Sequence, residues 1–96
     1  MNSKHETPNF SLTSSQEFER DLQRLDKGAR TPVAKKLASI RESGQLPKLE
    51  ALSGHLKGLH RFRVGNLRIL VEVDFVNHTI LAIGIEYRAD VYKQKR

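Results

Sequence analysis

Hydrophobic and polar residues follow a helical period in the first half of the chain and a strand period in the second half. Apolar residues at i, i+4 and i+7 predict an amphipathic helix that ends at Gly28. Ser14 and Glu17 stand three residues apart ahead of this run, which predicts a capping box with Ser14 at the N-cap. The apolar face of this helix consists of Phe18, Leu22 and Leu25.

A second helix is predicted directly after the first. Thr31 and Pro32 supply an N-cap and a proline for the first helical position. Gly44 is a typical residue for ending a helix. Its apolar stripe consists of Val33, Leu37 and Ile40. The two stripes of this helical hairpin need a sheet to cover them.

Beyond Gly44 the pattern changes to a period of two. Residues 45–58 contain one proline and two glycines and are predicted to form a connector. A weak alternation near the N-terminus, over residues 9–13, predicts a short edge strand. The other predicted strands cover residues 59–64, 67–75 and 79–87, joined by turns at 65–66 and 76–78.

The predicted order is β-α-α-β-β-β, which is an α+β fold. It consists of an N-terminal strand, a helical hairpin packed on one face of the sheet, and a three-stranded antiparallel meander. Ninety-six residues are enough for one modest hydrophobic core. We therefore expect a flexible lead-in over residues 1–9 and a single domain over residues 10–96.

The turn at Gly65 and Asn66 sets the register of the first long hairpin. A two-residue loop pairs Val64 with Leu67 and Arg63 with Arg68, and then Phe62 with Ile69 and Arg61 with Leu70. Side chains alternate between the two faces. The predicted core face carries Phe62, Val64, Leu67, Ile69, Val71, Val73 and Phe75. The opposite face carries Arg61, Arg63, Arg68, Glu72 and Asp74.

This register places Arg63 directly across from Arg68. Like charges at such a position destabilise a sheet. A solvated face, with arginine stems lying over Leu70, accounts for one or two of the arginines. A bound anion is a better explanation for all three arginines, because planar guanidinium groups can form paired hydrogen bonds with phosphate oxygens.

Composition narrows the kind of partner. A formal net charge of +6 and a pI near 10 favour a polyanion, such as nucleic acid or an acidic protein, although solubility alone is an alternative. There is no cysteine, and the four histidines are scattered, so neither a metal site nor a cofactor is expected. No apolar run approaches the roughly 20 residues of a membrane span, and the polar N-terminus does not resemble a signal peptide.

Two segments resemble the RelE/ParE superfamily of bacterial toxins from type II toxin–antitoxin modules. They read LSGHLKGLHRFRVGNLRILVEVD and LAIGIEYRADVYK. The arginines that flank the turn carry most of the resemblance, which covers residues 10–93. It implies a RelE-like fold.

The resemblance also implies an activity. RelE-type toxins are metal-independent endoribonucleases that cut mRNA in the ribosomal A site. The 2′-hydroxyl attacks the adjacent phosphate, and basic residues stabilise the developing charge. The implied location is the bacterial cytoplasm. The implied partners are the ribosome, mRNA and a cognate antitoxin, in a toxin–antitoxin complex that can be of higher order.

Carried over by position, the resemblance implies a set of catalytic residues. It consists of Arg61, Arg63, Arg68, Arg88 and Tyr92. The chain departs from the family at Tyr87, where a histidine is usual, and at Glu86, where a glycine is usual. An arginine cannot serve as the base, because it does not lose its proton. The base is left open between Glu50, Tyr87 and Tyr92.

Further residues are expected to contact RNA. They are Lys48, His55, Lys57, His60, Lys93 and Lys95. Two alternative functions remain at this point. One is a ParE-like inhibitor of DNA gyrase with the same fold, and the other is an inactive member that only binds its antitoxin.

Overall fold

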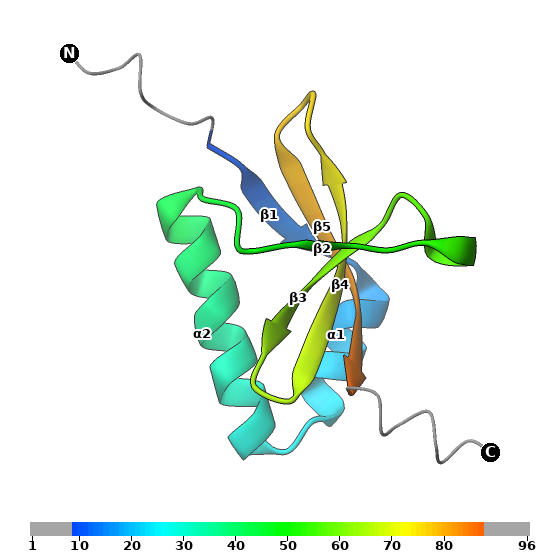
Figure 1. The fold of residues 1–96 in the computed structure, drawn as a ribbon. Coiled ribbons are helices and arrows are strands. Elements are labelled where there is room, and N and C mark those ends of the chain that lie inside the picture. The colour runs from blue at the N-terminus through cyan, green and yellow to red at the C-terminus, as the bar shows by residue number, and fades with distance from the viewer. Residues whose placement is uncertain (1–8, 88–96) are drawn as a thin grey trace.

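The computed structural model describes residues 9–87 and shows two helices packed on one sheet (Figure 1). Most of the predicted lead-in therefore lies outside the described residues, apart from Asn9. The helices are α1 (Gln16–Arg24) and α2 (Lys27–Ser43), with a short 3-10 turn, η2 (Gly54–Leu56), in the connector. The strands are β1 (Ser11–Ser14), β2 (Glu50–Ala51), β3 (His60–Val64), β4 (Leu67–Asp74) and β5 (Thr79–Tyr87).

The sheet confirms the predicted α+β class. Its five strands lie in the order β1-β5-β4-β3-β2. β1 runs parallel to β5, so the sheet is mixed, whereas the other neighbouring strands are antiparallel. Strand β2 was not predicted, because two exposed residues are too few to show an alternating pattern.

The first helix begins one residue later than predicted. Ser15 is the N-cap, and its hydroxyl accepts a hydrogen bond from the backbone N–H of Phe18 at 3.1 Å. The predicted capping box of Ser14 and Glu17 is therefore wrong. The Ser14 hydroxyl donates instead to the carboxylate of Glu19. Both serines are suitable caps by residue type, and the spacing to Glu17 favours the wrong one.

The second helix begins at Lys27, so the predicted start at Thr31 and Pro32 is wrong. Asp26 caps this helix, since its carboxylate accepts a hydrogen bond from Ala29 N at 3.1 Å. Pro32 lies in the sixth helical position, where it removes one backbone hydrogen bond to Gly28. Gly28 does not end the first helix, which stops at Arg24.

The end of the second helix is as predicted. Gly44 adopts a left-handed conformation with φ of 70°. Its carbonyl accepts a hydrogen bond from Phe10 N at 2.9 Å, which connects the helix to the segment before β1. A Cβ at this position would come within 2.9 Å of the Asn9 side chain, so both conformation and space favour glycine.

Both helices bury their apolar stripes against the same face of the sheet (Figure 1). Helix α1 packs on β5, and α2 packs on β1 and β3. One prediction for this face is wrong: Phe75 follows the end of β4 and is 53% exposed. The buried core consists of Phe10, Leu12, Phe18, Leu22, Val33, Leu37, Ile40, Phe62, Leu67, Ile69, Val71, Ile80 and Ala82.

Neither helix within residues 9–87 is long and apolar enough to cross a membrane.

The reassigned N-cap is open to a direct test. We expect Ser15→Ala to lower the free energy of unfolding by about 1 kcal/mol, because it removes the acceptor for Phe18 N. This corresponds to a drop in Tm of roughly 4–8 °C for a domain of this size. Thermal denaturation followed by circular dichroism measures the change. Ser14→Ala is the matched control, and a larger loss from Ser14→Ala than from Ser15→Ala would contradict the assignment.

Candidate anion-binding site

The β3–β4 hairpin has the predicted register. Arg61 pairs with Leu70, and Arg63 faces Arg68 across the ladder. The helices cover the opposite face of these strands, where Phe62 and Ile69 are buried. The arginine side of the hairpin is therefore the side that the helices leave uncovered. We call Arg61, Arg63 and Arg68 the arginine face.

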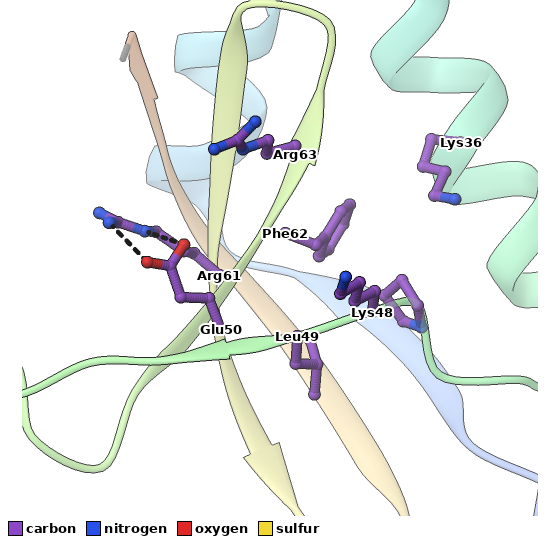
Figure 2. Close-up of a pocket in the computed structure, with 8 residues that line it drawn as sticks. Lys36, Lys48, Leu49, Glu50, Arg61, Phe62 and Arg63 are labelled. Atoms are coloured by element: carbon purple, nitrogen blue, oxygen red, sulfur yellow. Dashed lines mark hydrogen bonds and ion pairs between the residues drawn. The ribbon is translucent and has the colours of Figure 1, made fainter. Parts of the chain in front are cut away.

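Strand β2 brings a carboxylate to this face. Its pairing places Glu50 beside Arg61 in the ladder. Arg61 donates from Nε to one carboxylate oxygen at 3.1 Å and from Nη2 to the other at 3.2 Å (Figure 2). Such a bidentate pair holds a guanidinium group in a defined orientation.

A second carboxylate comes from β5. Glu86 pairs with Arg68 in the ladder, and its carboxylate also lies 3.5 Å from Nη1 of Arg61. The position of Glu86 depends on a register shift, because Leu70 pairs with Gly84 whereas Val71 pairs with Ala82. Without this bulge, alternation counted from the β4–β5 turn would place Glu86 opposite the buried Leu67. Sequence reasoning missed Glu86 for this reason.

Two guanidinium groups of the arginine face make no hydrogen bond or ion pair among residues 9–87. Arg63 is exposed, and Arg68 is half-buried with its Nε buried and not hydrogen-bonded within that part of the chain. Buried donors of this kind are almost always satisfied by an acceptor. The two carboxylates and three guanidinium groups leave an excess of positive charge. An oxyanion between Arg63 and Arg68 would supply the missing acceptor.

A groove of about 550 Å³ adjoins the arginine face. It lies between α2, the connector and β3 (Figure 2). Arg61 and Arg63 reach to one side of β3, and Lys36 and Lys48 lie on the other side (Figure 2). Lys36 was not predicted as a site residue, because nothing in the local sequence distinguishes it from the other lysines of α2. The lining residues are Lys36, Pro47, Lys48, Leu49, Glu50, Arg61, Phe62 and Arg63.

The surroundings of Glu50 favour its ionised form. The hydrogen bond from Arg61 lowers the pKa of the Glu50 carboxyl below its usual value of 4.5, and the charges of the arginine face add to the effect. A general base works best with a pKa near the working pH. The lowered pKa therefore makes Glu50 a weaker proton acceptor than an unperturbed glutamate, whereas its geometry suits it to orienting Arg61.

The structure separates the other predicted residues from the arginine face. His60 lies on the helix side, where its ring contacts Phe75 edge to face at 5.9 Å. Tyr87 pairs with Leu67, so strand alternation directs it to the same side. His55 and Lys57 are exposed in and next to η2, on a loop that projects away from α2 (Figure 1). Outside the described residues lie Arg88, Tyr92, Lys93 and Lys95.

Among residues 9–87, no group of three or more histidine, aspartate or glutamate side chains is arranged to hold a metal ion.

Known proteins share the fold of this chain, although comparison of sequences finds no match. No protein-family model matches the chain, and no curated protein sequence matches it. The toxin–antitoxin complex RelBE2 from Mycobacterium tuberculosis is similar in structure, with a TM-score of 0.72 at 20% identity. The similarity covers 84% of this chain and 100% of that chain.

Two other solved structures are similar. The RelB–RelE complex from Methanococcus jannaschii has a TM-score of 0.65 at 25% identity, covering 83% of this chain and 94% of that one. The isolated RelE toxin from E. coli has a TM-score of 0.61 at 18% identity, covering 90% and 94%. The chain therefore has the fold of RelE-type toxins, and the predicted fold family is confirmed.

The Glu50–Arg61 pair predicts a pH dependence of stability. Because the pKa of Glu50 is lower in the folded chain, the pair stabilises the fold fully above about pH 4.5, and this contribution is lost as the pH falls through the folded pKa. We expect Glu50→Gln to have a lower Tm than wild type at pH 7, with the difference closing at acidic pH.

Thermal denaturation of both proteins as a function of pH measures the effect. Glu42→Gln is the matched control, because Glu42 is an exposed glutamate on α2 without an ion pair among residues 9–87. A Tm difference between Glu50→Gln and wild type that persists unchanged at acidic pH would show that the Arg61 pair is not its cause.

Proposed function

We propose that this chain is the toxin of a type II toxin–antitoxin pair and that it cleaves mRNA on the ribosome as a metal-independent endoribonuclease. The observation that carries the proposal is the pair of facing arginines, Arg63 and Arg68, whose guanidinium groups make no hydrogen bond or ion pair among residues 9–87. A like-charge pair with free donors is suited to binding a phosphate. The RelE-type fold supports the same reading.

The main requirement of the proposed reaction is positive charge beside the phosphate. Attack of the 2′-hydroxyl on the adjacent phosphate forms a bond to phosphorus and breaks the bond to the 5′-oxygen, with extra negative charge on the non-bridging oxygens between the two events. Guanidinium groups that are already in place stabilise that charge without reorganisation. In the proposal, Arg63 and Arg68 bind the phosphate oxygens.

Arg61 has a different proposed role. Both of its hydrogen-bonding edges are already engaged, by Glu50 and by Glu86. Arg61 therefore contributes its charge from a fixed position beside the phosphate. Glu50 holds it there and is not the proton acceptor in this proposal. Tyr87 lies on the helix side of the sheet, so Tyr92 is the candidate of the sequence prediction that remains for proton transfer.

The proposed partners follow from the same role. Two of the similar structures are toxin–antitoxin complexes, which supports a cognate antitoxin as the inhibitor of this chain. Such a pair would act in the bacterial cytoplasm, where ribosomes and mRNA are found. An acidic antitoxin is suited to a chain with a net charge of +6.

The role of the arginine face can be tested with a double variant. We expect Arg63→Ala with Arg68→Ala to lower the rate of mRNA cleavage on translating ribosomes by at least about 10²–10³-fold, the usual cost of one such donor. Primer extension of the mRNA measures the cuts. The Tm should stay unchanged or rise slightly, because the variant removes a like-charge pair.

Arg20→Ala with Arg24→Ala is the matched control, since both arginines are exposed on α1, on the other side of the sheet. The control should cleave like wild type. Cleavage at the wild-type rate by the Arg63 and Arg68 double variant would show that these arginines are not the phosphate site. If the wild-type protein leaves mRNA intact and blocks DNA supercoiling by gyrase, the nuclease proposal is wrong and the ParE-like function takes its place.

A further inference from the structure

The groove next to the arginine face opens across an uncovered part of a strand edge. Strand β2 pairs with β3 only at His60 and Arg61. The outer edge of β3 beyond Arg61, at Phe62 and Arg63, is therefore not covered by β2, and both residues line the groove. A chain molecule bound to the arginine face can pass this edge and continue toward α2.

Two lysines lie where such a molecule would arrive. Lys36 comes from the middle of α2 and Lys48 from the connector, and both lie on the helix side of β3 (Figure 2). Both are exposed, and neither takes part in an ion pair or hydrogen bond within residues 9–87. The single carboxylate of the groove, Glu50, is bonded to Arg61 and so is not directed at the lysines. The helix side of the groove is thus positively charged without compensation.

The floor of the groove argues against an apolar partner. Phe62 is only 3% exposed, and Leu49 is half-buried, so little apolar surface is offered to a docking helix. Flexible lysine side chains with compact charges suit phosphates whose positions vary. A positively charged groove that follows a backbone is the typical arrangement for single-stranded nucleic acid.

We propose that this groove is the path of the RNA strand beyond the scissile phosphate, with Lys36 and Lys48 binding the neighbouring phosphates. The inference rests on the proposed function, since the arginine face supplies the first phosphate. It also gives the course of the RNA strand, which leaves the arginine face over the edge of β3 and runs toward α2. Lys36 becomes an RNA-binding residue.

Salt dependence tests the proposal, because each phosphate contact on a single strand contributes about 0.7 to the slope of log K against log salt. The probe is a fluorescent, 2′-O-methylated RNA decamer, which cannot be cleaved through its 2′-oxygen, and binding to the purified chain is followed by anisotropy. We expect Lys36→Ala with Lys48→Ala to reduce the slope by about 1.4. Binding of a labelled dinucleotide should stay unchanged, since it reaches only the arginine face.

Lys35→Ala is the matched control, because Lys35 is exposed on the same helix but does not line the groove. A slope for the double variant equal to that of the control would overturn the proposal. Equal weakening of decamer and dinucleotide would also overturn it, because the lysines would then act on the first phosphate. So would a loss of affinity for a polyglutamate peptide with unchanged RNA binding, which would assign the groove to an acidic protein.

The same assay keeps this proposal separate from the proposed function. Arg63→Ala with Arg68→Ala should weaken the binding of both the dinucleotide and the decamer. Unchanged binding in that variant would count against the arginine face as the phosphate site, whatever the lysine variants show. If the arginine variant weakens RNA binding but the lysine variant has the same salt slope as the control, only the proposed RNA path through the groove is overturned.

Discussion

Burial of one side of the β3–β4 hairpin determines what lies on the other side. Phe62, Ile69 and Val71 are buried beneath the helices, and a shift of one residue would move this apolar set to the uncovered face. Each large apolar side chain gains about 1.5–3 kcal/mol from burial. A cross-strand pair changes stability by only about 0.2–1 kcal/mol. The core therefore dominates, and Arg63 has to face Arg68 whether or not an anion is bound.

Carboxylates from two distant segments lower the net positive charge of the arginine face. Glu50 reaches the face through a strand of two residues, and Glu86 reaches it through a bulge in the β4–β5 ladder. Both bond to Arg61, so compensation is concentrated on one of the three guanidinium groups. Arg61 is thereby held in place, and Arg63 and Arg68 keep their donors for a ligand. The arginine face therefore has one guanidinium group held by carboxylates, that of Arg61, and two that are available to a ligand.

Local patterns predicted the helices, the long strands and the hairpin register, because period and turn chemistry carry that information. They failed where more than one residue suits the same role, as at the N-caps of both helices, where Ser15 and Asp26 are used. They also failed where distant segments meet. The contacts of Glu50 and Glu86 with Arg61, and the place of Lys36 in the groove, depend on a short strand, a bulge and a connector whose course no local period describes.

The Glu50–Arg61 pair connects the fold to the chemistry of the site. An ion pair with an exposed carboxylate contributes only modestly to stability, so its main effect is on the arrangement of the site. Pairing keeps β2 beside the first residues of β3, which leaves the outer edge of β3 open at Phe62 and Arg63. It also occupies the guanidinium group of Arg61 with the Glu50 carboxylate. Arg63 lies at the uncovered edge and lines the groove, and Arg68 lies directly across the ladder from it, so these two arginines are the ones open to a phosphate in the groove. The ion pair thus determines which arginines an anion can bind.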